Sequence, residues 1–438
     1  MQFSGKHHSE SRKSIIFVYH FFLIGHHYSM IYHIQAPQRL QTSICLPASK
    51  SISNRALLMS RMGEQCVVLS NLSDCDDTMV MQRALCHEHT ITDIMAAGTA
   101  MRFLTAYYAS SPGKKTLLTG TERMKHRPIA VLVNALRSLG AEIDYAGEEG
   151  FPPLEIVGKL LSGGDICLPG DISSQYISAL MMIAPLTEQG LTIHITGQLI
   201  SQSYVRLTEC MMKEFGVEVQ RMDERTIHIP HGSYSRAEYL IENDWSASSY
   251  WYEIIALASD ESSSVVLPYL SEDSLQGDSE VKHLFAPLGV KTEMVPQGIR
   301  LSQTGDCCSL YEADLQDQPD LAQTLVVTCA MKGIPFRITG LQTLRIKETD
   351  RLTALMQELK KLGYVIKEDN GCTLYWEGEK KDRESCPVIE TYEDHRMAMA
   401  FAPCAMKEGT IAINHPEVVR KSYPRFWEDL KQAGFIIH

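Results

Sequence analysis

The sequence of 438 residues has little of what marks metal-binding, membrane-spanning or nucleic-acid-binding proteins. Its twelve cysteines are scattered, with no CxxC pair and no zinc-type spacing, so we expect reduced thiols in a cytoplasmic protein and no metal centre. The net charge of −12 disfavours a nucleic-acid module, and basic residues are not interleaved with aromatic ones. The remaining composition, 44% hydrophobic and 21% charged, is that of a globular chain long enough for two domains.

Long hydrophobic runs are also missing, with one short exception near the N-terminus. Residues 12–24, RKSIIFVYHFFLI, combine two basic residues with a largely apolar run of ten residues. That run is too short to span a membrane. No small-x-small cleavage site follows it, so a signal peptide is the less favoured interpretation. We expect residues 1–29 to be an extension ahead of the natural start at Met30.

A helix–glycine–strand pattern recurs along the chain at nearly constant spacing. An amphipathic helix ends, and a short strand follows, at Gly140, Gly216, Gly289, Gly363 and Gly434, which are separated by 76, 73, 74 and 71 residues. Glycine suits this position because it ends a helix in the left-handed conformation. Residues 78–90 resemble the helix of a sixth copy but lack the glycine–strand ending, so we expect that copy to be truncated. Six such α/β units predict two lobes of three units, with ligands in the cleft between them.

The segment RIKETDR, residues 345–351, is the most charged of the candidate ligand-binding segments. It precedes an amphipathic helix predicted over residues 352–362, so its basic side chains lie at a helix N-terminus. Local ion pairs on a solvated helix start are the simpler explanation. The helix dipole opposes cations at that end, however, and Lys347 and Arg351 are spaced to share one helix face. The segment therefore indicates a site for an anionic ligand.

Six further segments combine basic, hydroxyl or small residues, mostly just ahead of predicted helices. They are LPASKSISNR (46–55), AAGTAMRF (96–103), RMKHRP (123–128), DISSQY (171–176), EDHRMAM (393–399) and RKSYPRF (420–426). Taken singly, each is explained as well by helix capping or surface charge. Together they supply at least five basic groups, which predicts a pocket for one or two multiply charged anions.

These motifs, with QPD at residues 318–320 and LRIKETDRL at residues 344–352, resemble the EPSP synthase (3-phosphoshikimate 1-carboxyvinyltransferase) family of enolpyruvyl transferases. They stand in the family's order from about residue 31 to the C-terminus. The resemblance implies an α/β fold of two lobes, each of three βαβαββ repeat units, with the active site in the interlobe cleft.

The resemblance also implies where the chain passes between the lobes, near residues 47 and 243. Residues 30–47 and 243–438 would then form a discontinuous first lobe, and residues 48–242 the second lobe.

The family transfers the enolpyruvyl group of phosphoenolpyruvate to the 5-hydroxyl of shikimate 3-phosphate and releases phosphate. The reaction is an addition followed by an elimination, in chorismate and aromatic amino-acid biosynthesis, and it uses no metal or organic cofactor. The resemblance thus implies a cytoplasmic, monomeric enzyme whose partners are these two small molecules, with no nucleic acid and no membrane.

Individual roles follow from the same resemblance. Asp320 matches the family's general base, Glu348 its general acid, and Lys347 lies near the reacting hydroxyl; carboxyls fill both roles when their pKa values are tuned apart. The residues expected to bind shikimate 3-phosphate are Lys50, Ser51, Arg55, Ser173, Ser174, Gln175, Ser201, Tyr204, Asp320, Thr343 and Lys347. Those expected to bind phosphoenolpyruvate are Lys50, Gly98, Arg127, Gln175, Arg351, Arg396 and Lys421.

The chain departs from the family pattern in several places. Ala96 stands where the family usually has Asn, Phe103 where it has Pro, and Thr343 where Asn is common. Some two dozen residues are missing between Asp77 and Ala96. We therefore expect weaker binding of phosphoenolpyruvate, or an altered response to its mimics such as glyphosate.

Two alternatives remain open at this point. The enolpyruvyl transferase that acts on UDP-N-acetylglucosamine typically has a KxxN start and a reactive loop cysteine, whereas here Lys50 is followed by SISNR and no cysteine lies in a basic loop. A non-catalytic phosphate-binding paralogue is disfavoured because Asp320, Glu348 and the five cations are all present.

Overall fold

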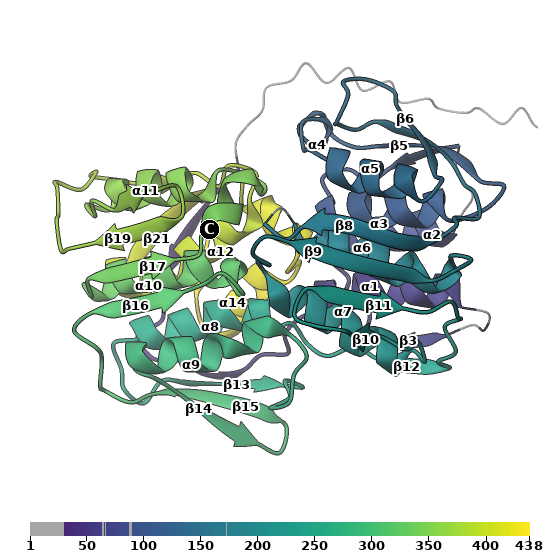
Figure 1. Ribbon diagram of the computed structural model, residues 1–438. Coiled ribbons are helices and arrows are strands. Elements are labelled where there is room, and N and C mark those ends of the chain that lie inside the picture. The colour runs from purple at the N-terminus through teal and green to yellow at the C-terminus, as the bar shows by residue number, and fades with distance from the viewer. Residues whose placement is uncertain (1–29, 64, 66, 87–89, 172) are drawn as a thin grey trace, which may run out of the picture.

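Two α/β lobes lie side by side, joined by two chain crossings (Figure 1). The computed structural model describes residues 30–63, 65, 67–86, 90–171 and 173–438. The expected extension over residues 1–29 lies outside the described residues. No helix in the described part of the chain is long and apolar enough to cross a membrane.

The first lobe contains three four-stranded sheets and the helices packed on them. Its strands are β1 (Ile31–Gln35), β2 (Gln41–Ser43), β13 (Ser264–Pro268), β14 (Val290–Val295), β15 (Gly298–Gln303), β16 (Tyr311–Asp314), β17 (Phe336–Thr339), β18 (Lys367–Asp369), β19 (Thr373–Trp376), β20 (Val388–Ile389), β21 (Thr410–Asn414) and β22 (Ile436–Ile437). Its α-helices are α8 (Trp245–Leu257), α9 (Val281–Phe285), α10 (Ala322–Lys332), α11 (Arg351–Lys361), α12 (His395–Phe401), α13 (Ala405–Glu408) and α14 (Phe426–Gln432). The sheet orders are β20-β21-β1-β22, β14-β15-β13-β2 and β16-β17-β19-β18.

The second lobe contains two four-stranded sheets and one two-stranded sheet. Its strands are β3 (Val68–Ser70), β4 (Ile91–Asp93), β5 (Lys115–Thr119), β6 (Glu142–Tyr145), β7 (Leu154–Val157), β8 (Gly164–Pro169), β9 (Leu191–Thr196), β10 (Gln220–Arg221), β11 (Thr226–Ile229) and β12 (Glu238–Leu240). Its α-helices are α1 (Lys50–Met62), α2 (Asp76–Cys86), α3 (Gly98–Ala109), α4 (Glu122–Lys125), α5 (Ala130–Ser138), α6 (Ser174–Ile183) and α7 (Gln202–Glu214). The sheet orders are β4-β5-β7-β6, β10-β11-β9-β8 and β12-β3.

The predicted repeat is confirmed by the strand pairing. In each four-stranded sheet two strands pair in parallel and two further strands add antiparallel; β16 and β17 are parallel, for example, with Tyr311 opposite Phe336, while Phe336 faces Trp376 of antiparallel β19. The sixth sheet keeps the parallel pair of β3 and β12, and the described residues supply no antiparallel strands beside it. This is the truncated copy that the sequence predicts.

The five repeat glycines end helices as expected. Their φ angles are +97° at Gly140, +87° at Gly216, +85° at Gly289, +93° at Gly363 and +98° at Gly434. These values lie in the left-handed region, where a side chain with a Cβ is strained. The glycines therefore fix the point at which each helix turns back into its sheet.

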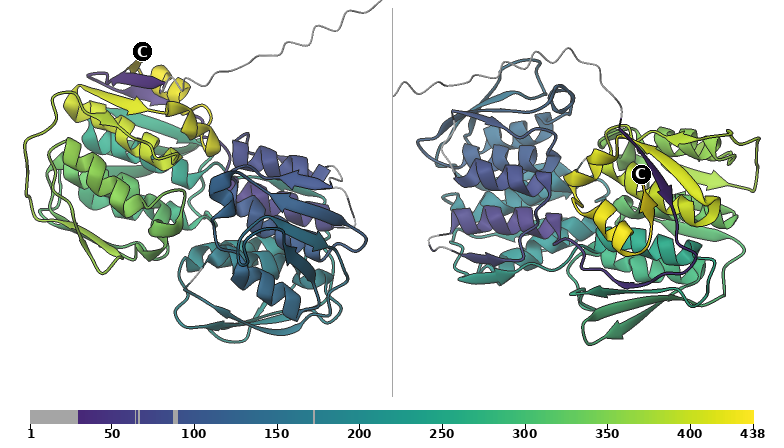
Figure 2. Two further views of the ribbon diagram at one scale, coloured as in Figure 1. Left: turned by 90° about the horizontal axis from the view of Figure 1, so that it is seen from above. Right: turned by 180° about the vertical axis from the view of Figure 1, so that it is seen from behind.

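Buried apolar side chains form two separate cores. One runs from Ile34 to Leu46 and from Trp245 to Phe435, and the other from Ala48 to Ile241. The two crossing segments run side by side, because Ala48 pairs with Asn243 in a β-bridge. The N-terminal strand β1 pairs with β21 and β22 near the C-terminus, as Figure 2 shows, so the chain returns to the lobe in which it starts.

Candidate active site

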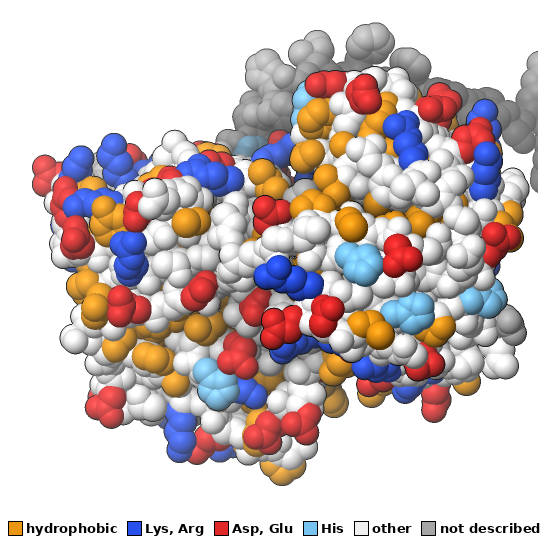
Figure 3. All heavy atoms as spheres, viewed as in Figure 1, with side chains coloured by type: hydrophobic (Ala, Val, Ile, Leu, Met, Phe, Trp, Pro, Cys, Tyr) orange, Lys and Arg blue, Asp and Glu red, His pale blue; other side chains and the backbone are white. Residues whose placement is uncertain are grey.

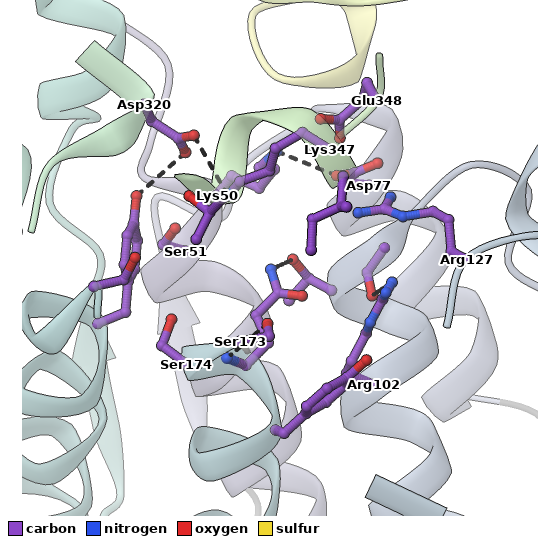
Figure 4. A pocket seen from close by; sticks show the side chains of 18 of the residues that line it. Lys50, Ser51, Asp77, Arg102, Arg127, Ser173, Ser174, Asp320, Lys347 and Glu348 are labelled. Atoms are coloured by element: carbon purple, nitrogen blue, oxygen red, sulfur yellow. Dashed lines mark hydrogen bonds and ion pairs between the residues drawn. The ribbon is translucent and has the colours of Figure 1, made fainter. Parts of the chain in front are cut away.

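One pocket between the lobes brings nearly all the predicted site residues together. The predicted residues that line it are Lys50, Ser51, Arg55, Gly98, Arg127, Ser173, Ser174, Gln175, Ser201, Tyr204, Asp320, Thr343, Lys347, Glu348, Arg351 and Arg396. We call this the interlobe pocket. Lys421 lines the adjoining hollow, and its Nζ lies 3.0 Å from Glu348 Oε1. In Figure 4, Asp320, Lys347 and Glu348 of the first lobe face Ser51, Ser173 and Ser174 of the second.

Local capping chemistry sets where the helices around the interlobe pocket begin. Ser49 caps α1 by accepting a hydrogen bond from the Ile52 amide at 3.4 Å, and Ser173 caps α6 by accepting one from the Gln175 amide at 3.3 Å. The N-termini of α1, α3, α6, α7 and α11 all carry pocket-lining residues. The positive ends of several helix dipoles therefore meet where basic side chains also gather.

In the charged segment of residues 345–351, some side chains stabilise the start of α11 and others line the interlobe pocket. Asp350 is the N-cap of α11, and Arg345 pairs with it at 2.7 Å, away from the pocket lining. Because α11 begins at Arg351, Lys347 lies ahead of the helix, and the expectation that the two share a helix face is wrong. They meet nevertheless, since both reach the carboxylate of Asp320.

Three cations surround the Asp320 carboxylate. Arg396 Nη2 lies 2.8 Å and Arg351 Nη1 3.1 Å from its oxygens, Lys347 Nζ lies 3.7 Å away, and the Tyr204 hydroxyl donates a hydrogen bond at 3.2 Å. Burial alone would raise the pKa of Asp320, but Arg396, Lys347 and Arg351 outweigh it and hold the pKa well below its usual value. The group is an anion throughout the physiological range.

Glu348 has the same kind of surroundings. Lys421 Nζ and Arg351 Nη2 each lie 3.0 Å from one of its oxygens. Burial would raise the pKa of Glu348, but these two cations outweigh it and lower the pKa well below its usual value. The structure therefore lowers both carboxyl pKa values, whereas the roles of general base and general acid predict pKa values that are tuned apart.

Arg351 is the hub of this cluster. Its side chain is 1% exposed, and it contacts Asp320, Glu348 and Asp394, whose Oδ2 lies 2.7 Å from its Nε. Burial would lower the pKa of Arg351, but Asp394 and the other two carboxylates outweigh it and raise the pKa. One guanidinium thus fixes three carboxylates from separate segments of the first lobe.

The second lobe, by contrast, presents buried guanidinium groups that have no acidic partner within ion-pair distance among the described residues. Arg55 donates to Thr208 Oγ1 at 2.8 Å and to the Ser51 carbonyl at 2.9 Å, and burial lowers its pKa to about 10. Burial, with Arg127 nearby, also lowers the pKa of Arg102 to about 10. Burying a cation without a counter-ion costs free energy, because the charge loses its hydration. An anionic ligand at these guanidinium groups would offset that cost.

Gly98 allows two of these groups to come together at the start of α3. A Cβ at this residue would lie 2.6 Å from Arg127 Nη1 and 3.1 Å from Arg102 Nη1. Only the missing side chain lets both guanidinium groups approach the first turn of the helix. The result is a cradle of N–H donors for an anion.

Seven residues of the interlobe pocket lie outside the predicted set of site residues. They are Asp77, Thr99, Arg102, Pro128, Tyr176, Ile346 and His395. Asp77 pairs with Lys50 at 3.2 Å and raises its pKa, against a lowering by burial. Arg102 and His395 stand inside quoted motifs and could have been chosen there. Asp77 lies outside every quoted motif, so no pattern in the sequence indicated it.

His395 is buried and neutral. Burial, Lys50 and Arg396 lower its pKa well below the usual value, and neither ring nitrogen has a hydrogen-bond partner among the residues that the structure describes. The hydroxyl of Thr343 is likewise buried without a partner. Both line the interlobe pocket, so both are available to a ligand.

The departures from the family pattern have structural partners of their own. The carbonyl of Ala96 accepts a hydrogen bond from Lys421 Nζ at 2.9 Å, across the cleft. Phe103 is fully buried, and the Arg55 guanidinium lies over its ring, 5.3 Å from the centroid. Phe103 thus supports a pocket residue through a cation–π contact.

No cluster of three or more histidine, cysteine or carboxylate side chains suited to a metal ion occurs in the part of the chain that the structure describes. On the face shown in Figure 3, basic and acidic side chains are interspersed over both lobes. The concentration of charge in the interlobe pocket is thus a local feature.

Comparisons with known proteins agree with this geometry. The chain is 53% identical over 406 residues to a 3-phosphoshikimate 1-carboxyvinyltransferase of Bacteroides fragilis strain YCH46, covering 93% of this chain and 98% of that protein. A Shewanella pealeana protein of the same name is 34% identical over 430 residues, covering 91% and 98%. A solved EPSP synthase from Acinetobacter baumannii shares the fold, with a TM-score of 0.74 at 20% identity over 93% of this chain and 99% of that one. The sequence profile described as EPSP synthase (3-phosphoshikimate 1-carboxyvinyltransferase) matches residues 34–88 and 82–430, and the chain belongs to this family.

Proposed function

We propose that the protein transfers the enolpyruvyl group of phosphoenolpyruvate to the 5-hydroxyl of shikimate 3-phosphate, giving 5-enolpyruvylshikimate 3-phosphate and phosphate. The observation that carries this proposal is the interlobe pocket itself. It joins Arg55 and Arg102 of the second lobe, which are buried and have no acidic partner among the described residues, to a carboxylate–cation cluster in the first lobe. Two anionic substrates and proton transfer require that combination.

Shikimate 3-phosphate is assigned to the second-lobe side of the pocket. Arg55 supplies the charge for its phosphate, because it is buried and has only neutral hydrogen-bond partners. Across the cleft, Asp320, Lys347 and the unpartnered hydroxyl of Thr343 face the same space. The remaining residues that we assign to this substrate are Lys50, Ser51, Ser173, Ser174, Gln175, Ser201 and Tyr204.

Phosphoenolpyruvate carries a phosphate and a carboxylate and is assigned to the cations nearest Glu348. The cradle at Gly98, with Arg127, takes one of these groups. Arg351, Arg396 and Lys421 take the other, with Lys50 and Gln175 between the two substrates. The adjoining hollow, which Lys421 and Arg127 also line, opens this side of the site toward solvent.

The chemistry is an addition followed by an elimination. Asp320 accepts the proton of the 5-hydroxyl as its oxygen bonds to C2 of phosphoenolpyruvate, and Glu348 delivers a proton to C3. The C2–O bond to phosphate then breaks and C3 loses a proton, which restores the double bond. The cations that surround the carboxylates stabilise the phosphate as it leaves.

The low pKa values of the two carboxyls bear on this scheme. A free Glu348 that is fully ionised cannot donate a proton. The negative charge of phosphoenolpyruvate beside Lys421 and Arg351 offsets the cations that lower the Glu348 pKa, so binding raises that pKa toward the range where it can act as an acid.

Three further assignments, of the lobe boundaries, the cellular location and the oligomeric state, complete the proposal. The lobe boundaries near residues 47 and 243 are supported by the division between the two cores. A cytoplasmic location is supported by the described cysteines, which are all free thiols. The protein is assigned as a monomer, as the family resemblance implies.

The test is phosphate release by the purified protein. We expect phosphate only when both substrates are present, in equal amount to the enolpyruvyl product. Release with UDP-N-acetylglucosamine in place of shikimate 3-phosphate would favour the alternative transferase. Tight binding of both ligands without release would favour a non-catalytic binding protein.

A further inference from the structure

Helix α7 begins at the lobe interface, and its own N-cap residue does not cap it. Ser201 has φ +53°, and its hydroxyl accepts no hydrogen bond from the helix. The amide of Gln202, the first residue of α7, donates instead to Asp317 Oδ1 at 2.8 Å. Asp317 belongs to the first lobe, so the cap of this second-lobe helix comes from across the cleft.

Neighbouring contacts hold the same turn against the first lobe. The Ser201 amide donates to the Gln316 carbonyl at 3.0 Å. The Ser203 hydroxyl donates to the Asp317 carbonyl at 2.6 Å. A Cβ at Gly277 of the first lobe would lie 2.3 Å from Ser203 Cβ, so the turn docks closely there as well.

This turn of α7 carries two pocket residues, Ser201 and Tyr204. The Tyr204 hydroxyl donates to Asp320 at 3.2 Å, and Asp320 stands three residues after Asp317 on the same segment. The 316–320 segment therefore holds α7 at its start and at its third residue. Moving the lobes apart would break both contacts and leave the Gln202 amide without its cap.

We propose that Asp317 is a positioning residue for shikimate 3-phosphate: by capping α7 from the opposite lobe, it holds Ser201 and Tyr204 in place while the two lobes are in contact at this turn. The identity of the ligand rests on the proposed function. The physical reason is that the cap exists only while the two lobes are in contact at this turn. A protein whose binding-competent arrangement is less populated binds its ligand more weakly by the same factor.

The variant Asp317→Ala removes the cap, and Asp317→Asn keeps an acceptor oxygen without the charge. The free energy lost with a helix N-cap corresponds to about a 2- to 30-fold change in the equilibrium between the arrangement that has the cap and the one that lacks it. We expect Asp317→Ala to raise KM for shikimate 3-phosphate by that factor and KM for phosphoenolpyruvate by less. Asp317→Asn should stay within about twofold of the wild type, because asparagine caps helices as well as aspartate does.

The matched control is Asp223→Ala. Asp223 accepts a hydrogen bond from the Arg225 amide at 2.7 Å in an exposed hairpin of the second lobe, remote from the pocket lining. This variant loses a similar local bond, and its KM values should match those of the wild type.

Hydrogen exchange supplies a readout that does not depend on turnover. Asp317→Ala should speed exchange of the backbone amides at residues 202–205 in the free protein, while Asp317→Asn and Asp223→Ala should leave it unchanged. If the wild-type protein gave no product, the proposed function would fail. The exchange experiment would still show whether Asp317 caps α7.

Three results would overturn the inference. They are unchanged exchange and KM in Asp317→Ala, an Asp317→Asn variant as impaired as Asp317→Ala, and equal rises in both KM values with a lower unfolding temperature. The last would mean that Asp317 only stabilises the fold.

Discussion

Replacing Arg351 with methionine tests the idea that one buried guanidinium fixes the carboxylate cluster of Asp320, Glu348 and Asp394. The change leaves Asp394, Asp320 and Glu348 without the group that lies 2.7 to 3.1 Å from each of them. Removing one partner of a buried ion pair costs about 3–5 kcal/mol, because the remaining charge stays buried. Since Arg396, Lys347 and Lys421 remain near two of the three carboxylates, we expect a loss within that range rather than beyond it.

The chain offers a selective assay for this loss. All four tryptophans, Trp245, Trp251, Trp376 and Trp427, lie in the core of the first lobe, which also holds Arg351. Their fluorescence during urea unfolding therefore reports on that lobe. With a urea slope of about 2–3 kcal/mol per M for a lobe of this size, the midpoint should fall by about 1–2.5 M at pH 7.5.

The loss should also depend on pH. Because the folded pKa values of Asp320 and Glu348 are lowered, their stabilising contribution is present above the unfolded values and is lost as pH falls through the folded ones. Without Arg351 these pKa values should be higher in the folded variant, so its buried carboxyls begin to take up protons near pH 4.5. The variant should therefore differ most from the wild type at pH 7.5 and less at pH 4.5.

The matched control is Arg345→Met, which removes the partly exposed ion pairs of Arg345 with Asp350 and Glu368 from the same segment. We expect it to change stability by about 1 kcal/mol or less. The reasoning would be refuted if Arg351→Met shifted the midpoint no more than this control, or shifted it equally at both pH values.

Two further substitutions probe separate parts of the account. Gly98→Ala should displace the Arg127 guanidinium, because Nη1 of Arg127 lies 2.6 Å from the position of the new Cβ. We expect KM for phosphoenolpyruvate to rise about 10- to 100-fold in steady-state assays. The control is Gly232→Ala, because a Cβ at Gly232 meets open space. A KM for phosphoenolpyruvate unchanged by Gly98→Ala would contradict the assignment of that substrate to the N–H donors at Gly98. Burial and Asp320 raise the pKa of Asp278 to about 7, so wild-type stability should fall as pH rises from about 4 to 7. Asp278→Asn should remove that fall and be more stable at pH 8 by about 2–4 kcal/mol in urea unfolding; identical pH profiles would contradict it.

Local patterns in the sequence predict much of this structure. The five glycines and their spacing predict the repeat, because ending a helix in the left-handed conformation is a local requirement. Arg55, Arg351 and the other cations could be chosen from motifs because they stand at helix starts. The truncated sixth unit is visible as a missing glycine–strand ending.

The features that the sequence did not predict depend on contacts between distant segments. Asp77 meets Lys50 only after α2 packs beside α1, and its own segment carries no distinctive motif. The pKa values of Asp320 and Glu348 depend on how many cations arrive at the same point, which spacing does not give. The cap on α7 comes from Asp317, 115 residues further along the chain.

The most direct test of the central claim, that Asp320 and Glu348 transfer protons between two anions held in one pocket, is phosphate release by Asp320→Asn and Glu348→Gln. These changes keep the shape of each side chain and remove its ability to exchange a proton. We predict that both proteins still bind shikimate 3-phosphate and that phosphate release falls about 10²- to 10⁴-fold in each. Turnover near the wild-type rate in both variants would contradict the account.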